Sequence, residues 1–348
     1  MASADSAASR ILIVRLSAMG DLIHGIPVLC ALRQALPQAT LGWVAEGRNA
    51  DLLQGHPDLD HLVRVPRHWW KSPRAVLNMR RNLRALNFDT TLDLQCLSKS
   101  ALAARLSGAP RRIGYAGSLG REVSRYLHNE LVDGAAEHVI DRYLKILRPL
   151  GIENPVAQWN LPETADDGAF ADQAINDLGL VAGNFAIANP GAGWASKRWP
   201  TERYGELARR LAEDHDLQTL AVWGGPDELP LAETIAAAGG DCVRVAPATT
   251  MTQLAALARR ARLFVGSDTG PLHLAVAVGT PSVSLHGTSL AAQTCAYGPA
   301  NRSIQVHYDN SPGKRRTEDD SAKRAITVDH VVSVCDELLS TPRQARSA

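Results

Sequence analysis

The chain has 348 residues, of which 45% are hydrophobic and 21% are charged, and its formal net charge at pH 7 is +1. This composition excludes a wholly disordered, collagen-like or coiled-coil protein, and the length suggests two domains at about 150 residues per domain. No apolar run reaches the roughly 18 residues that a membrane-spanning helix needs, so no transmembrane segment is expected.

The first ten residues, MASADSAASR, are small and polar and lack the apolar core of a secretory signal. Residues 1–10 are therefore predicted to be a disordered tail. The five cysteines lie far apart and show no CxxC spacing. This argues against a disulfide framework or a structural zinc site, and a reducing cytoplasm is the expected compartment.

The charges are divided unevenly along the chain. Residues 1–160 carry 20 Lys and Arg against 14 Asp and Glu, a net charge of +6, and the remainder carries 17 against 22, a net charge of −5. Much of the positive excess lies in the stretch 67–84. A solvated basic face is the simpler interpretation. A surface for an anionic partner, such as nucleic acid, phosphorylated lipid or an acidic sugar, is the functional one.

Short β-branched runs alternate with longer helical patterns along the whole chain, which is typical of parallel sheets covered by helices on both faces. A first series of strands is predicted at residues 11–16, 40–46, 62–66, 89–95 and 111–116. A second series is predicted at residues 185–191, 219–225, 242–247, 263–268 and 282–287. Helical periodicity lies between the strands, for example at residues 21–36 and 201–214.

We therefore predict an α/β protein of two doubly wound, Rossmann-like domains. A turn-rich segment at 151–183 marks the boundary between them. The domains are assigned to residues 11–165 and 166–325. The polar stretch 308–324 is predicted to be a mobile loop. A last helix is predicted at 327–340, within a C-terminal segment at 326–348.

In open α/β sheets, ligands bind beyond the carboxyl ends of the strands, where loops lead into helix N-termini. After the first predicted strand, Gly20 permits an unusual turn and Asp21 stands at the start of a helix. A helix N-cap explains Asp21 most simply, and a general base is the functional interpretation. His24, one turn further along, either faces an acceptor or is a half-buried structural histidine.

Two further junctions lie in the second half of the chain. In the segment 189–200, Gly191 and Gly193 allow a ligand to approach the backbone, and Lys197 offers a charge for a phosphate. The third glycine and the later acidic residue of a dinucleotide fingerprint are missing, which disfavours a nicotinamide-dependent enzyme. Glu228 opens a later helix, where it either caps the helix or accepts hydrogen bonds from the diol of a nucleotide.

The most specific junction is the segment 264–287, in which a strand runs into Ser-Asp-Thr-Gly and then a helix. The N–H groups of Thr269 and Gly270 are expected to point at an anion, assisted by the helix dipole. His273 lies on the same helical turn. An N-cap explains Asp268 or Thr269 alone but not the whole set, so an anion site is predicted here.

Five segments resemble glycosyltransferase family 9, the heptosyltransferases, and occur in the family's order. They are RILIVRLSAMGDLIHGIPVLCALR, DLQCLSKSALAARLSGAPRRIGY, PGAGWASKRWP, VWGGPDE and VGSDTGPLHLAVAVGTPSVSLHG. The resemblance covers roughly residues 10–300. It implies a GT-B fold, in which two Rossmann-like domains face a cleft and a C-terminal helix packs back on the N-terminal domain.

The resemblance also implies an activity and a set of site residues. The activity is inverting transfer of L-glycero-D-manno-heptose from ADP-heptose to a Kdo sugar of the lipid A inner core, in lipopolysaccharide core biosynthesis, with no metal ion or other cofactor. Asp21 takes the role of general base. Glu228 and Met251 match positions near the ribose and the adenine. All the positions matching donor contacts are Gly191, Ala192, Gly193, Lys197, Glu228, Met251, Asp268, Thr269, Gly270 and His273.

The chemistry agrees with these roles, because an inverting displacement needs a base on the acceptor side and positive stabilisation of the departing ADP. No Asp-x-Asp metal clamp stands at the end of a predicted strand, so Lys197 and the helix terminus at Gly270 are expected to neutralise the leaving group.

The acceptor side is assigned to the basic N-terminal half, because Kdo carries a carboxylate and lipid A carries phosphates. The candidate acceptor residues are Lys71, Arg74, Lys99, Arg111 and Arg112. Trp69 and Trp70 either touch a sugar or the membrane face or belong to the core. We expect a cytoplasmic enzyme, peripheral at the cytoplasmic face of the inner membrane.

Two features depart from the family pattern and leave other acceptors open. Cys96 stands where many relatives carry Gly, and the sequence SLHGTS at 284–289 replaces a more usual Gly-Pro-Thr turn. The alternatives are a family 9 transferase with another nucleotide sugar or acceptor, a protein included, a less closely fitting two-domain epimerase, and a non-catalytic nucleotide-sugar-binding protein. A nucleic-acid partner is not expected, since the basic stretch lacks a recognition motif and interleaved stacking aromatics.

Overall fold

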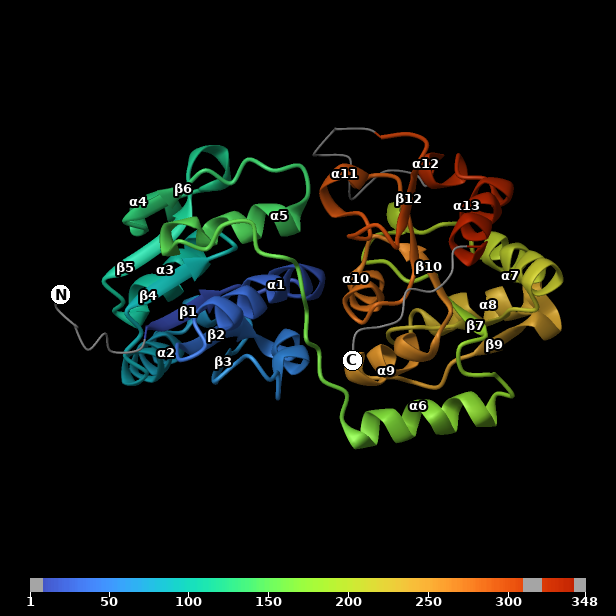
Figure 1. Cartoon of the computed structure of the whole chain (residues 1–348), viewed down its shortest axis with the longest axis horizontal. Helices are drawn as coiled ribbons and strands as arrows, with labels where there is room; N and C mark the ends of the chain where they lie inside the picture. The colour runs from blue at the N-terminus through green and yellow to red at the C-terminus, as the bar shows by residue number, and fades with distance from the viewer. Residues whose placement is uncertain (1–8, 309–320, 341–348) are drawn as a thin grey trace. The chain divides into compact units, whose positions relative to one another are not determined.

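A computed structural model describes residues 9–308 and 321–340 of the chain. The chain divides into two compact units between Pro162 and Glu163, close to the predicted boundary at residues 165 and 166 (Figure 1). Most of the predicted N-terminal tail and of the predicted loop at 308–324 lies outside the described residues. Arg10 already belongs to the first strand.

The first unit is a parallel sheet of six strands in the order β3-β2-β1-β4-β5-β6. Its strands are β1 (Arg10–Val14), β2 (Thr40–Glu46), β3 (His61–Val65), β4 (Thr90–Asp93), β5 (Arg111–Tyr115) and β6 (Glu130–Val132). Its helices are α1 (Met19–Ala35), α2 (Pro73–Ala85), α3 (Ser98–Ser107), α4 (Ser124–Leu127) and α5 (Val139–Leu144).

The second unit repeats this plan, with six parallel strands in the order β12-β11-β10-β7-β8-β9. Its strands are β7 (Phe185–Asn189), β8 (Gln218–Ala221), β9 (Val243–Val245), β10 (Leu263–Ser267), β11 (Ser282–His286) and β12 (Arg302–Gln305). Its helices are α6 (Ala165–Asp177), α7 (Thr201–His215), α8 (Leu229–Gly239), α9 (Met251–Arg260), α10 (Gly270–Ala277), α11 (Ala291–Thr294), α12 (Ser321–Arg324) and α13 (Val328–Ser340).

The prediction of two doubly wound α/β domains is confirmed. Each sheet gains one strand that the sequence pattern did not reveal, β6 in the first unit and β12 in the second. Both are short edge strands of three and four residues, and most of their side chains are exposed or half-buried. Strands of this kind carry little hydrophobic periodicity, which is the signal that sequence analysis uses.

Each sheet reverses its strand order once, between β1 and β4 in the first unit and between β7 and β10 in the second. Ligands of such sheets bind beyond the carboxyl ends of the strands at the reversal. The topology therefore places residues 15–21 beside residues 94–99 in the first unit. In the second unit it places residues 190–197 beside residues 268–270.

The C-terminal helix belongs to the second unit. The apolar face of α13, with Val331 and Cys335 fully buried, joins the core formed by α7, α8 and their sheet, and α13 lies beside α7 in Figure 1. The expectation that this segment also packs on the N-terminal domain stays a prediction. Its periodicity predicts a buried face, but the surface that buries it depends on tertiary structure.

Two local features concern the backbone at Cys96 and the short helix at residues 321–324. Cys96 has a φ of 47°, the left-handed conformation that glycine adopts most readily. Residues 321–324, predicted to be mobile, form the helix α12, in which Lys323 is buried. None of the helices in the described part of the chain is both long and apolar enough to cross a membrane.

Candidate functional site

Asp21 lies just beyond the carboxyl end of β1, in the first turn of α1. It is the third residue of that helix rather than its N-cap, and its Oδ2 accepts a hydrogen bond from the Ala18 N–H at 3.2 Å. The same oxygen forms an ion pair with Arg15, whose side chain is 7% exposed. The Asp21 side chain is 40% exposed. The carboxylate is thus held by the helix start and by a buried cation, and it remains open to solvent.

A second ion pair stands at the same edge of the sheet. Lys99, at the start of α3, contacts Glu46 Oε2 at 3.1 Å and donates to Ser17 Oγ at 3.2 Å. Its ammonium lies 5.2 Å from the centre of the Trp70 ring, within the range of a cation–π interaction. Sequence analysis predicted Lys99 here and missed Arg15 and Glu46.

The structure separates the five predicted acceptor residues into two groups. Lys71, just before α2, and Arg74, in its first turn, are exposed on the same edge as Lys99. Arg111 and Arg112 begin β5 and therefore lie at the opposite, amino edge of the sheet.

The two arginines of β5 have structural partners at that edge. Arg111 binds Glu130 at 2.6 and 3.0 Å and donates to Pro149 O, and Arg112 donates to the carbonyls of Leu127 and Ala109. The structure therefore does not bring them together with Lys99, because the charge count of a sequence does not tell which edge of a sheet a strand residue occupies.

Of three ambiguous residues in the first unit, Trp69 and His24 are buried. Trp69 is 1% exposed and packs in the core with Met79 and Leu83, whereas Trp70 is half-buried. His24 is 4% exposed and its ring meets that of His138 edge to face, with 6.1 Å between ring centres.

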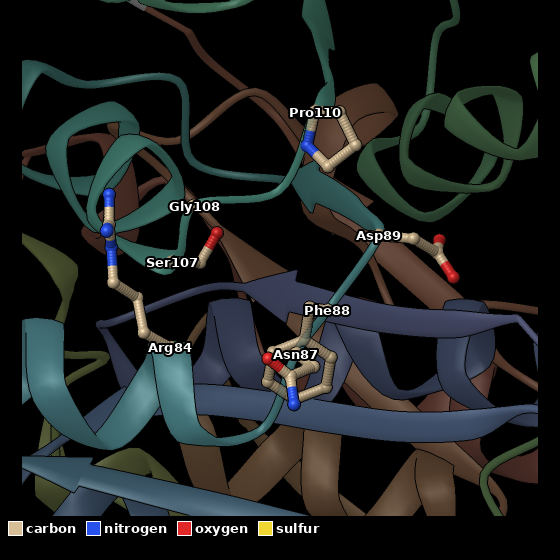
Figure 2. A pocket seen from close by; sticks show the side chains of 7 residues that line it. All are labelled: Arg84, Asn87, Phe88, Asp89, Ser107, Gly108 and Pro110. Carbon is tan, nitrogen blue, oxygen red and sulfur yellow. The ribbon is translucent and has the colours of Figure 1, made fainter.

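A surface depression of about 510 Å³ in the first unit is not part of this site. Figure 2 shows it between the ends of α2 and α3 and the starts of β4 and β5, which is the amino edge of the sheet. Its lining residues are Arg84, Asn87, Phe88, Asp89, Ser107, Gly108 and Pro110. Asp21 and Lys99 lie at the other edge.

In the second unit, the loop after β7 packs closely against Glu228. A Cβ atom on Gly191 would lie 2.3 Å from Glu228 Oε2, so a larger residue there would require the Glu228 side chain to move. The predicted cap of α8 by the Glu228 side chain is absent; the carboxylate accepts a hydrogen bond from the Gly224 N–H at 2.8 Å instead. The Glu228 carboxylate is therefore part of the loop edge rather than of the helix end.

Lys197 and His273 converge on Asp268, which follows β10 directly. Lys197 Nζ lies 2.9 Å from Asp268 Oδ2, and His273 Nε2 lies 3.0 Å from Oδ1. Burial alone would raise the pKa of Asp268. The hydrogen bond with His273 and the charge of Lys197 outweigh burial and hold this pKa well below its ordinary value. Asp268 is therefore ionised and orients both partners.

The Ser-Asp-Thr-Gly turn leads into α10 as predicted. Thr269 is the N-cap residue of α10, but its hydroxyl donates to Ser267 O at 3.1 Å and accepts from Asn189 Nδ2 at 3.1 Å rather than capping the helix. The first N–H groups of a helix have no partner within it. The start of α10 at Gly270 thus combines free helical donors with the nearby ammonium of Lys197, which suits an anion.

The remaining predicted donor positions lie on neighbouring loops. Ala192 is buried, Gly193 is exposed, and Met251 is the first residue of α9 and is half-buried. All these positions follow strands at the carboxyl edge of the second sheet.

Two buried residues of this region escaped sequence analysis. His286 ends β11, and its Nε2 is buried without a hydrogen-bond partner. Lys323 donates from Nζ to Ser267 Oγ at 3.0 Å and to Leu285 O. Lys323 lies in a highly charged stretch, so the sequence alone gave no sign of burial.

Replacing His286 by glutamine is expected to flatten the acid sensitivity of the protein. Burial lowers the pKa of His286 to about 3. Between this value and its ordinary value the unfolded chain binds one more proton, so stability falls as the pH drops below about 6.5, by up to about 1.4 kcal/mol per pH unit. Urea unfolding at pH 7 and pH 4.5 should show a smaller loss for the variant. An equal loss in both proteins would contradict the expectation.

Two groups of side chains among the described residues have ligand atoms close enough together to hold a metal ion. They are Cys30, His56 and Asp58, and Asp93, Cys96 and His128. In the second group, Asp93 Oδ2 accepts from Ser100 Oγ at 2.9 Å and lies 3.2 Å from His128 Nε2. In the first, both ring nitrogens of His56 already have backbone partners. Both groups belong to the first unit and have structural bonds, so neither is assigned to the anion site.

Residues 76–323 match the family model of glycosyltransferase family 9 (heptosyltransferase). The chain is 28% identical over 326 residues to lipopolysaccharide heptosyltransferase 1 of Pseudomonas aeruginosa, covering 88% of this chain and 87% of that protein. It is 26% identical over 305 residues to the lipopolysaccharide core heptosyltransferase OpsX of Haemophilus influenzae, covering 86% and 85%.

Solved structures with the same fold include two members of this group. Heptosyltransferase WaaC of E. coli, solved with ADP-2-deoxy-2-fluoro heptose, is 26% identical with a TM-score of 0.75 and covers 94% of this chain and 99% of its own. A family 9 glycosyl transferase of Veillonella parvula has a TM-score of 0.84 at 22% identity, covers 97% and 99%, and supports the fold alone.

Proposed function

This chain belongs to glycosyltransferase family 9, the heptosyltransferases, and we propose that it moves L-glycero-D-manno-heptose from ADP-heptose to a Kdo sugar of the lipid A inner core. The transfer inverts the anomeric centre and uses no metal ion. The observation that carries the proposal is the cluster of Lys197, Asp268 and His273 beside the start of α10, which is built to hold an anion. The names of the relatives support a place in lipopolysaccharide core biosynthesis.

On the donor side, the second unit binds the diphosphate and stabilises it as it leaves. Lys197 supplies a positive charge, and the N–H groups at Gly270 supply donors where negative charge develops. Glu228 accepts hydrogen bonds from the ribose hydroxyls, and Met251 contacts the adenine. His273, oriented by Asp268, faces the heptose.

On the acceptor side, Asp21 acts as the general base. The acceptor oxygen bonds to the anomeric carbon as the bond from that carbon to the β-phosphate oxygen breaks. The hydroxyl proton passes to the Asp21 carboxylate, and the bonding electron pair leaves with ADP. Arg15 holds the carboxylate in one orientation, and Lys99 offers a charge to the Kdo carboxylate.

The donor residues themselves support a reaction without a metal ion. The carboxylate beside the proposed diphosphate site, Asp268, has both oxygens engaged by Lys197 and His273. A divalent cation on Asp268 would have to displace Lys197. Lys197 and the N-terminus of α10 instead neutralise the charge of the departing diphosphate, as a cation does in metal-dependent transferases.

We place the acceptor at a membrane surface, where lipid A resides. The stretch 67–84 exposes Arg67, Lys71, Arg74 and further arginines of α2, and it contains no Asp or Glu. Leu77, on the same helix, is 61% exposed. A basic helix with an exposed leucine suits an anionic lipid surface at the cytoplasmic face of the inner membrane.

The test is release of ADP from ADP-heptose, with and without heptose-free Kdo-lipid A and in the presence of EDTA. We expect release that depends on the acceptor and is unchanged by EDTA, and a product whose anomeric configuration, read by NMR, is opposite to that of the donor. Binding of ADP-heptose without release would move the search to other acceptors. The absence of binding would overturn the donor assignment, and loss of activity with EDTA would overturn metal independence.

A further inference from the structure

Lys323 is a buried cation that the proposed transfer mechanism does not use. Its side chain is 1% exposed, and its Nζ donates to Ser267 Oγ at 3.0 Å and to Leu285 O. Both partners are neutral and stand at the carboxyl ends of β10 and β11. Burying a charge is costly unless an opposite charge compensates it. The position of Lys323 therefore calls for a nearby anion.

The protein itself provides too little negative charge there. The titratable groups that interact with Lys323 are Asp268, Lys197 from the loop after β7, and His286 at the end of β11; His273 of α10 contacts Asp268. Asp268 already engages Lys197 through Oδ2 and His273 through Oδ1. The single negative charge of Asp268 thus has to compensate two lysines, and the cluster has an excess of positive charge.

The segment that carries Lys323 is fixed in place against this cluster. Trp199 Nε1 donates to Ile326 O at 2.9 Å, and Arg203 donates to Arg324 O at 2.7 Å. A Cβ atom on Gly287 would lie 3.3 Å from Lys323 Cγ, so the glycine leaves room for the lysine stem. Because Trp199 follows Lys197 by two residues, one loop both presents Lys197 and anchors the Lys323 segment.

We propose that Lys323 is a further positioning residue of the donor site, which supports the Ser-Asp-Thr-Gly turn and takes up a proton when the donor diphosphate binds. This inference rests on the proposed function, because it takes the bound anion to be the diphosphate of a nucleotide sugar. The two negative charges of the diphosphate compensate Lys197 and Lys323 together, which Asp268 alone does not.

The direction of the pH effect follows from the surroundings of Lys323. Burial lowers the pKa of Lys323 to about 7; the charge of Asp268 opposes this shift only in part, and Lys197 adds to it. A bound diphosphate favours the charged form and raises the pKa again. Above pH 7, binding therefore consumes a proton, and affinity for the donor decreases as the pH rises.

The experiment is calorimetric titration of the full chain with ADP-heptose, without acceptor, between pH 6 and pH 8.5 in two buffers of different ionisation enthalpy. ADP-heptose is a diphosphate diester whose charge is constant in this range, whereas free phosphate monoesters titrate near about pH 6. We expect Kd to rise about tenfold between pH 6 and pH 8.5, with uptake of up to one proton per donor at pH 8.

Two variants and a control assign the proton to Lys323. Lys323→Met removes the charge at similar length and should abolish both the pH slope and the proton uptake. Lys323→Arg keeps a permanent charge, so this variant should bind ADP-heptose with the same Kd at pH 8.5 and at pH 6. Arg209→Met, which removes an exposed charge from α7, should behave as the wild type.

The outcomes separate this inference from the proposed function. Donor binding without a pH slope in the wild type, or a slope that persists in the Lys323 variants, overturns the role of Lys323 and leaves heptose transfer standing. If circular dichroism shows that Lys323→Met does not fold, Lys323→Arg is the test. Loss of proton uptake in this variant supports the role of Lys323, and persistence of the uptake contradicts it. A pH slope without ADP release on Kdo-lipid A overturns only the acceptor, and no donor binding at any pH overturns both.

Discussion

Replacing Asp21 by asparagine is expected to lower kcat for heptose transfer by about 10³-fold, because general-base catalysis contributes about 10²–10⁴-fold. Asparagine keeps an oxygen that can accept from the Ala18 N–H, so the start of α1 and the fold should persist. ADP-heptose should bind with unchanged Kd, because the donor residues belong to the second unit. Single-turnover ADP release and calorimetric donor binding measure the two quantities separately.

The control for this variant is Asp166→Asn, which makes the same change in the first turn of α6, at an exposed position of the second unit. It should retain full activity. If Asp21→Asn kept more than about a tenth of the wild-type kcat, Asp21 would be a structural residue of the helix start and another group would have to accept the proton.

Asp21 also illustrates which features of the site could be predicted from the sequence. Its place after a β-branched run predicted both a helix start and an edge position, and the structure confirms both. The partner Arg15 was not predicted, although it stands only six residues earlier. An arginine at the end of a strand is usually solvated, and its burial depends on Tyr143 and Leu94, which come from distant parts of the chain.

Dependence on distant parts of the chain also explains the other differences between the predicted and the observed site. Lys197, Asp268 and His273 were predicted to belong to one site because Lys197 and Asp268 follow predicted strands, His273 lies on the turn after Asp268, and all three match donor contacts in the family resemblance. The strand that begins at Arg111 was predicted with the right start, but the acceptor residues were chosen by charge, so Arg111 was grouped with Lys99 although it lies at the opposite edge of the sheet. Lys323 and His286 depend on which segment covers the sheet edge, and hydrophobic periodicity contains no signal for that choice.

Replacing Lys197 by methionine is expected to lower kcat/KM for ADP-heptose by about 10³-fold, with a part of the loss in donor Kd. Removing one preorganised group that stabilises developing charge costs about 10²–10³-fold, and the donor also loses an attractive charge in the ground state. Lys197→Arg, which keeps the charge, should recover part of the activity. Arg209→Met again serves as the control for the loss of one positive charge.

The Lys197 variant also changes the balance around Asp268, and this separates its catalytic role from a structural one. The Asp268 side chain is 10% exposed, and without Lys197 it keeps the contact with His273. Because Lys197 helps to hold the pKa of Asp268 below its ordinary value, that carboxylate stabilises the folded state above about pH 4 and loses this contribution as the pH falls further. Lys197→Met should weaken this contribution, so urea unfolding at pH 7 should show lower stability.

Asp268→Asn with Lys197→Met should lose less stability than the two single changes added together. A loss of stability without a loss of ADP release would show that Lys197 only holds Asp268, and the departing diphosphate would then need another cation.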